Sequence, residues 1–252
     1  MSKLKELYEN KGVLFALLWI ILYCAVMTPV KGNYGEDSIY MLLALLIVAA
    51  AILAFVRSNR MEADFGLAGW PEDTKRYLYF IPMWVLATGN LWGGISLNYR
   101  GAGQIIAILS MLTIGFIEEM IFRGFLFTSL LRENRPAVAI IISAVTFGMG
   151  HIVNLFAGQA SLETFIQIIF AVAWGFMLTM VFYRSGSLLP CIIAHGFIDA
   201  FSTMVADNHL ADMIYVWATI ITAIVYCTYL WRLQETESTH IGKESEGHEK
   251  RA

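Results

Sequence analysis

Long apolar stretches with few charged residues recur along almost the whole chain. Each is long enough for a helix to cross a hydrocarbon core of ~30 Å. The stretches are continuously apolar rather than alternating, which argues against membrane-spanning β-strands. We therefore predict an all-α, polytopic membrane protein with about eight transmembrane helices. The predicted spans are Val13–Val30, Ile39–Val56, Tyr77–Leu97, Gly101–Ile117 with an extension to Leu131, Ala137–Asn154, Thr164–Tyr183, Ser185–Ala206 and Met213–Trp231.

The overall composition agrees with a membrane protein. Hydrophobic residues make up 58% of the 252 residues and charged residues 15%, with a mean hydropathy of +0.63. Soluble domains are about 45–50% apolar and about 25% charged. The net charge of −3 provides no basic surface for nucleic acid. Cys24, Cys191 and Cys227 are isolated within apolar stretches, so we interpret them as small core residues rather than disulfide or zinc-site cysteines.

The distribution of positive charge predicts the orientation. With eight spans, the N-terminus, the even-numbered loops and the C-terminal tail share one side, and this side carries 14 of the 17 Lys and Arg residues. The other side carries only Lys31 and Arg100, while Arg123 lies within a span. Because cytoplasmic loops are enriched in Lys and Arg, we expect both termini in the cytoplasm and the protein in the plasma membrane. Residues 1–233 form the expected transmembrane domain, and the polar residues 234–252 a disordered cytoplasmic tail.

A few ionisable residues fall inside the predicted spans, away from the helix ends. A charge in the middle of a bilayer costs a few kcal/mol, so such a residue must face a partner or a wet cavity. The residues lie on only three of the predicted helices, within residues 101–206, and this concentration marks a candidate functional site. They are Glu118, Glu119, Arg123, His151, His195 and Asp199.

The two adjacent carboxylates have different predicted partners. Glu119 and Arg123 are spaced i, i+4, which places them within ion-pair reach on one helix face. Glu118 points about 100° away and is left as the freer carboxylate, suited to act as a general base for water. The alternative is that the motif is a structural Glu–Arg pair that holds two helices together.

Two histidine motifs follow on later helices. Phe147 and His151 share a helix face, and His151 is either a hydrogen-bonded core residue or a group that assists a water at Glu118. His195 and Asp199 repeat the i, i+4 spacing. They could stabilise an oxyanion, or Asp199 could fix the tautomer of His195. A hydrogen bond that only supports helix packing is the alternative.

The order of these motifs on successive apolar helices closely resembles the CPBP family. This family includes CAAX prenyl endopeptidases of the Rce1 type and bacterial bacteriocin-processing and immunity proteins, also called the Abi family. The resemblance covers roughly residues 101–206. It rests on Glu118-Glu119-x-x-x-Arg123, Phe147-x-x-x-His151 and His195-x-x-x-Asp199.

The resemblance implies an intramembrane endopeptidase that hydrolyses peptide bonds of membrane-associated proteins or peptides. Glu118 would activate the water with help from His151, Glu119 and Arg123 would support the site, and His195 with residue 199 would form the oxyanion hole. The family often has Asn at position 199. Because an ionised Asp199 only accepts hydrogen bonds, either it is protonated or it orients His195, which then donates alone.

No cofactor is expected, although Glu118, His151 and His195 could supply three zinc ligands. The expected partners are a membrane-embedded or lipidated peptide substrate and membrane lipids, but not nucleic acid. A non-proteolytic membrane scaffold or bacteriocin-immunity protein is the main alternative, and a proton-coupled transporter is a third reading. One geometric condition remains, because His151 must come level with Glu118 although it lies near the end of its helix.

Overall fold

The structure is a computed structural model that describes residues 3–71, 80–156 and 159–249. In these ranges the regular structure is helical and contains no β-strand, which confirms the all-α prediction. The helices in chain order are α1 (Lys3–Asn10), α2 (Gly12–Tyr34), α3 (Ile39–Ser58), α5 (Ile81–Ala87), η1 (Gly89–Leu91), α6 (Ala102–Glu119), η2 (Met120–Phe127), α7 (Thr128–Glu133), α8 (Pro136–Met149), η3 (Gly150–Ile152), α9 (Val153–Phe156), α10 (Ser161–Ser185), α11 (Leu189–Ser202) and α12 (His209–Glu249).

The protein is an integral membrane protein. Six helical segments in the described part of the chain are long and apolar enough to cross a bilayer. One of them, Ala102–Glu133, is continuous through α6, η2 and α7, and another, Pro136–Leu155, runs from α8 through η3 into α9. The remaining four are Gly12–Tyr34, Ile39–Ser58, Ser161–Ser185 and His209–Leu233.

The other two predicted spans are shorter in the structure. The span expected at Ser185–Ala206 is the 14-residue helix α11, about 21 Å long at 1.5 Å per residue. The span expected at Tyr77–Leu97 contains α5 and η1, and its first three residues lie outside the described ranges. Helix α11 can be shorter than the hydrocarbon core because it packs against α6, α5 and α10, so protein rather than lipid surrounds much of its length. Its buried residues include Cys191, Ala194 and His195.

The C-terminal segment differs from the sequence expectation. The structure continues α12 through residue 249 as one helix, whereas the polar composition of residues 234–252 predicts a disordered tail. The residues from 234 to 249 contain no proline and several good helix formers such as Glu, Gln and Lys, which permits the helix to continue.

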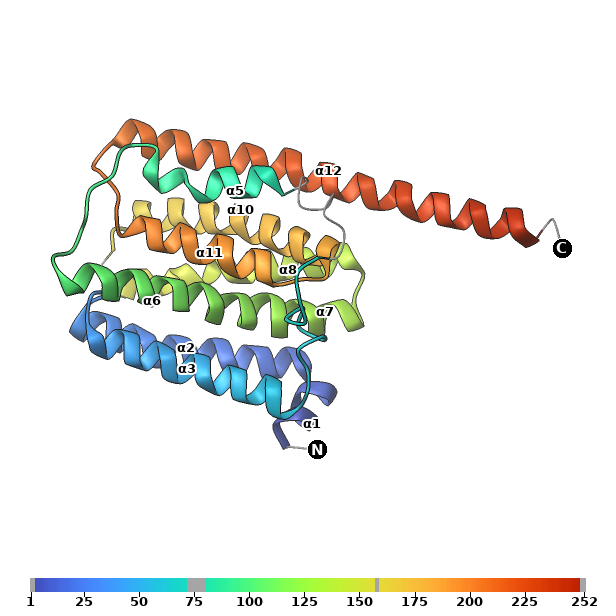
Figure 1. The fold of residues 1–252 in the computed structure, drawn as a ribbon, viewed down its shortest axis with the longest axis horizontal. Coiled ribbons are helices and arrows are strands. Elements are labelled where there is room, and N and C mark those ends of the chain that lie inside the picture. Colours follow the sequence, from blue (N-terminus) through green and yellow to red (C-terminus); the bar gives the residue numbers. More distant parts are fainter. Residues whose placement is uncertain (1–2, 72–79, 157–158, 250–252) are drawn as a thin grey trace.

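The helices form a bundle in which α6, α11, α8 and α10 make up the centre. In Figure 1, α2 and α3 lie along one side of α6, and α12 and α5 lie on the opposite side of the bundle. The most extensive pairings are α6 with α11 and α8 with α10. Both chain ends lie at one end of the bundle, while the α2–α3 loop lies at the other end (Figure 1). The three helices that carry the candidate site residues are therefore central.

Glycines allow the central helices to approach one another closely. A Cβ atom at Gly115 of α6 would lie 2.5 Å from the backbone nitrogen of Gly196 in α11. A Cβ atom at Gly148 of α8 would lie 2.9 Å from the carbonyl oxygen of Ile168 in α10. Because small residues at helix crossings in membranes let two backbones touch, these glycines place α6 against α11 and α8 against α10.

The long helix Ala102–Glu133 changes from an α-helix to a π-helix directly after Glu118 and Glu119. Residues Met120–Phe127 form a π-helix, η2, in which every residue is buried. Serine and threonine hydroxyls donate to carbonyls of this segment, with Ser143 Oγ of α8 3.0 Å from Phe122 O and Ser129 Oγ 2.6 Å from Phe125 O. These bonds satisfy backbone groups at a wide helical turn, a feature that is often found at functional sites.

An aromatic cluster anchors the N-terminal helix to the π-helix. The fully buried Tyr8 of α1 packs edge-on to Phe15 and Phe65, with ring centroids 5.5 Å and 5.2 Å apart. Its hydroxyl lies 2.9 Å from Thr128 Oγ1 and accepts a 2.9 Å hydrogen bond from Arg132. Burial raises the pKa of the Tyr8 hydroxyl above its ordinary value, so Tyr8 stays neutral in this cluster.

Candidate active site

A buried ion pair occupies the junction of α6 and η2. Arg123 Nη1 donates to Glu119 Oε1 at 2.7 Å, and both side chains are 0% exposed. The pairing predicted from the i, i+4 spacing is therefore present. Arg123 also donates to Thr179 Oγ1 and to the Gly175 carbonyl of α10, each at 3.3 Å. Because a buried charge is tolerated only when it is paired and hydrogen-bonded, these contacts fix both side chains in place.

The same carboxylate binds a histidine on the neighbouring helix. His195 Nδ1 of α11 lies 2.8 Å from Glu119 Oε1, and since a carboxylate only accepts, Nδ1 carries the proton. The ring of Phe147 packs against both His195 and Arg123. Its centroid lies 5.4 Å from that of the His195 ring and 4.3 Å from the guanidinium carbon of Arg123. Glu119, Arg123 and His195 therefore form one unit that joins α6, η2 and α11.

Glu118 is the accessible carboxylate of the adjacent pair. Its side chain is 17% exposed, whereas that of Glu119 is fully buried. Tyr23 of α2 donates to Glu118 Oε1 at 3.2 Å, and Glu118 Oε2 lies 3.7 Å from His195 Nε2. The predicted division into one paired and one freer carboxylate agrees with this geometry.

Asp199 lies on the opposite side of the His195 ring from Glu119. Its Oδ2 is 3.4 Å from His195 Nε2, and its side chain is 24% exposed. The sequence left open whether Asp199 fixes the tautomer of His195. In the structure Glu119, not Asp199, binds Nδ1 of His195 and so fixes its tautomer. Asp199 and Glu118 both lie near Nε2.

His151 reaches the site because helix α8 ends early. The regular helix stops at Met149, and a 3-10 turn, η3, carries His151. Its ring packs edge-on to Phe147 at 5.7 Å between centroids. In the described part of the chain, His151 Nδ1 is buried without a hydrogen-bond partner. His151 and Glu118 line the same cavity.

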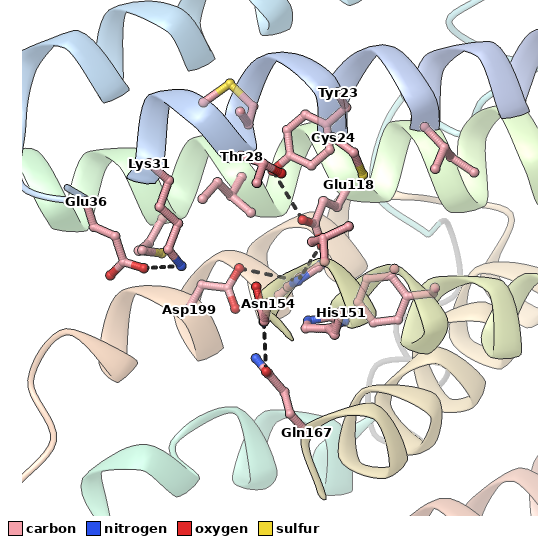
Figure 2. Close-up of a pocket in the computed structure, with 18 of the residues that line it drawn as sticks. Tyr23, Cys24, Thr28, Lys31, Glu36, Glu118, His151, Asn154, Gln167 and Asp199 are labelled. Carbon is pink, nitrogen blue, oxygen red and sulfur yellow. Dashed lines mark hydrogen bonds and ion pairs between the residues drawn. The ribbon is translucent and has the colours of Figure 1, made fainter. Parts of the chain in front are cut away.

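One cavity of about 250 Å³ brings these residues together. Glu118, His151, His195 and Asp199 line it, and Figure 2 shows Glu118, His151 and Asp199 around the cavity with Tyr23 bonded to Glu118. Glu119 and Arg123 do not line it and instead lie behind His195. The cavity thus separates the six predicted site residues into four that a substrate could meet and two that support them.

The cavity extends along α2 to the end of the bundle opposite the chain termini. At that end it is lined by Lys31 and Glu36, whose side chains form an ion pair with 2.5 Å between Nζ and Oε1. The Tyr99 hydroxyl donates to the other carboxylate oxygen of Glu36 at 2.9 Å. Burial and the adjacent Glu36 raise the pKa of Tyr99 above its ordinary value, so this hydroxyl keeps its proton.

A second cavity of about 210 Å³ lies on the other side of the histidines. It shares Phe147, His151, His195 and Asp199 with the first cavity, and its remaining walls include Phe170 and Trp174 of α10. The candidate site therefore has space on both sides of its titratable residues.

The zinc alternative does not fit the arrangement of the side chains. Within the described ranges, no group of three or more His, Cys, Asp and Glu residues is placed to hold a metal ion.

Sequence reasoning did not identify several polar residues of the cavity. Tyr23 bonds to Glu118 from α2, and the Asn154 amide donates to Gln167 Oε1 at 2.8 Å on the opposite wall (Figure 2). A tyrosine in the middle of an apolar span was the available signal for Tyr23, because a buried hydroxyl requires a partner.

Comparison with known proteins finds a family model that matches the central segment of the chain. The family model described as type II CAAX prenyl endopeptidase Rce1-like matches residues 102–201. This range starts with α6 and ends in α11, so it includes all six site residues named above. No curated protein and no solved structure matches the chain. The match agrees with the resemblance seen in the motifs: residues 102–201 of this integral membrane protein are similar to the Rce1-like domain of type II CAAX prenyl endopeptidases.

Proposed function

We propose that the protein is an intramembrane endopeptidase in which Glu118 activates the hydrolytic water. The observation that carries the proposal is that Glu118 lines one cavity with His151 and His195, while the adjacent Glu119 is withdrawn into a buried ion pair. A carboxylate that is accessible, yet largely shielded from bulk solvent, is suited to general-base catalysis.

The proposed reaction assigns a task to each residue. Glu118, assisted by His151, removes a proton from a water that attacks the carbonyl carbon of the scissile peptide bond. His195 Nε2, when it carries a proton, donates to the oxyanion, since Nδ1 is engaged by Glu119. The C–N bond then breaks, and Glu118 returns the proton to the leaving amine. Asp199, 3.4 Å from Nε2, shares the oxyanion side of the site.

The proposed substrate is a membrane-embedded or lipidated protein or peptide. The cavity lies among membrane-spanning helices, and much of its wall is apolar, with Met27, Met41, Met111 and Ile114 between its polar ends. A substrate with apolar side chains near the cleaved bond would fit this wall.

Replacement of Glu118 by Gln tests the proposal directly. The amide is of similar size but cannot take the proton of water, so cleavage of a membrane-proximal peptide should fall by at least a thousandfold while the protein remains folded. Purified wild type and Glu118→Gln, with Glu163→Gln as a surface control, would be compared by mass spectrometry of peptide products. Undiminished cleavage by Glu118→Gln would reject the proposal. If the protein is instead a scaffold or immunity protein, Glu118→Gln and His151→Gln cells would keep the wild-type phenotype.

The proposed orientation places both termini in the cytoplasm of a plasma-membrane protein, so the Lys31–Glu36 end of the cavity faces outward. This follows from the 14 Lys and Arg residues on the side of the termini. In intact cells, a membrane-impermeant maleimide should label Asp37→Cys in the α2–α3 loop but not Glu133→Cys at the other end. Labelling of Glu133→Cys alone would reverse the orientation.

A further inference from the structure

We infer that the second cavity is a hydration site that supplies water to Glu118 while a substrate occupies the first cavity. The inference rests on the proposed endopeptidase function and adds to it the route of the reacting water. Several side chains form a wall of both cavities, so the two spaces are direct neighbours. The shared residues are Phe147, His151, Gln167, His195, Asp199 and Ser202.

A substrate would displace water from the first cavity. The cavity that Glu118 and His151 line has an apolar wall that includes Met27, Met41 and Met111. An apolar peptide that packs against this wall removes the wall and itself from water, yet the hydrolysis of each peptide bond consumes a water. A source of water on the other side of the histidines resolves this conflict.

Trp174 gives the second cavity a polar group that lacks a protein partner. Trp174 is 3% exposed and lines the second cavity but not the first. Its Nε1 is buried without a hydrogen-bond partner in the part of the chain that the structure describes. A buried indole N–H usually has an acceptor. A water in the cavity would supply one, because internal waters bond to buried polar groups that the protein leaves unpaired.

Other polar side chains of the second cavity offer both donors and acceptors. Asn90 donates its amide to the Ile198 carbonyl at 2.7 Å, so its own carbonyl oxygen is the group that can accept. Gln167 is the reverse, since its Oε1 accepts from Asn154 at 2.8 Å (Figure 2) and its amide can donate. Asp199 adds a carboxylate, which disfavours an anion.

Water fits this set of groups, because it is neutral and both donates and accepts hydrogen bonds. The volume of the second cavity is about 210 Å³. A water molecule in the liquid occupies about 30 Å³, so the cavity has room for several waters between Trp174 and the shared residues His151 and Asp199.

The first measurement asks whether the second cavity holds water, and it needs no substrate. A brief X-ray pulse converts water into hydroxyl radicals that oxidise the side chains beside bound water, and mass spectrometry locates these side chains in the purified full-length protein. After correction for the reactivity of the free amino acids, Trp174 should be oxidised about tenfold faster than Phe125. Phe125 is the internal reference, because it is fully buried and lines neither cavity.

The second measurement uses Ala171→Leu, which fills the second cavity. Ala171 is buried and lines the second cavity but not the first. The oxidation of Trp174 should fall about fivefold in this variant, because the leucine takes the place of water. In steady-state cleavage of a peptide whose hydrolysis depends on Glu118, kcat should fall about tenfold while KM stays unchanged, because the substrate binds in the first cavity. A distorted substrate site would instead raise KM.

The matched control is Ala173→Leu, which adds the same side chain at a buried position of α10 that lines neither cavity. It should leave the oxidation of Trp174 and kcat unchanged. Because a buried leucine can also prevent folding, Trp174→Phe provides a variant that removes the N–H donor and adds no volume. It should lower kcat about threefold at unchanged KM, since one bond to the water is lost.

Three results would overturn the inference. The first is oxidation of Trp174 no faster than that of Phe125, and the second is an unchanged kcat in Ala171→Leu although the oxidation of Trp174 has fallen. The third, which decides if Ala171→Leu does not fold, is an unchanged kcat in Trp174→Phe. If Ala171→Leu suppresses the oxidation of Trp174 but the wild-type protein cleaves no peptide, the hydration site stands and the endopeptidase proposal fails.

Discussion

Glu119 Oε1 accepts a 2.8 Å hydrogen bond from His195 Nδ1 across the α6–α11 interface. The same oxygen lies 2.7 Å from Arg123 Nη1. One carboxylate oxygen therefore neutralises a buried cation and sets the orientation of a histidine on another helix. This dual contact separates the two adjacent glutamates, since Glu119 serves structure and orientation while Glu118 remains available to a substrate.

Glu119→Gln should destabilise the protein more than Glu118→Gln. The change leaves Arg123 as a buried charge without its carboxylate, and breaking such a pair costs about 3 kcal/mol. Glu118 is partly exposed, so its replacement should cost less than about 1 kcal/mol. Unfolding in detergent followed by tryptophan fluorescence would compare the variants. Equal losses in the two variants would contradict the assignment of Glu119 as the structural carboxylate.

Tyr23→Phe should lower kcat about tenfold and change KM little. The Tyr23 hydroxyl holds one oxygen of Glu118 at 3.2 Å, and without it the carboxylate can adopt orientations that do not face the water. Steady-state cleavage of a peptide whose hydrolysis depends on Glu118 provides the measurement. Tyr34→Phe is the control on the same helix, since Tyr34 is exposed and lies outside the cavity. An equal effect of both substitutions would remove Tyr23 from the site.

Asp199→Asn and Asp199→Leu should differ in activity. An Asn side chain keeps a polar group near His195 Nε2 and can donate to an oxyanion, so it should retain cleavage within about threefold. Leu removes the polar group beside His195 Nε2, the proposed oxyanion donor, and should lower kcat about a hundredfold, the size of effect expected when an oxyanion donor is no longer held in position. The two variants would be assayed on the same peptide at equal protein levels. An equal loss in both would mean that the negative charge at position 199 is required.

Gly115→Ala should reduce the free energy of unfolding by about 2 kcal/mol. The added methyl group would lie 2.5 Å from the Gly196 nitrogen, so α6 and α11 would have to separate. Gly32→Ala is the matched control in a membrane helix, because a Cβ at Gly32 meets no atom within 4 Å. Thermal unfolding of the two variants checks the expectation, and unchanged stability of Gly115→Ala would show that the interface can relax.

The helical fold could be predicted from the apolar stretches, but the length of two helices could not. The rule that a span needs about 20 residues assumes contact with lipid. Helix α11 is instead largely enclosed by α6, α5 and α10, and only the three-dimensional packing reveals this. The close contact of Gly115 with Gly196 also joins helices that are far apart in the sequence.

The candidate site was predictable where its contacts are local. Glu119 with Arg123 and His195 with Asp199 follow from i, i+4 spacing. The bonds of Glu119 to His195 and of Tyr23 to Glu118 cross 76 and 95 residues of sequence. No local pattern encodes such contacts, because they depend on which helix faces meet in the bundle.

The π-helix at Met120–Phe127 interrupts the α-helical repeat of the long helix Ala102–Glu133. Residues before and after it therefore do not follow a single rotation of about 100° per residue. The turn after Glu119 accommodates more residues than an α-turn, so the direction of Glu118 is set independently of the direction in which α7 meets α1 and α2. Removing one residue from this segment would rotate one end against the other by about 100°. Conservative substitutions of the apolar residues within Met120–Phe127 should therefore be tolerated far better than single-residue deletions, although both change only one position of the chain.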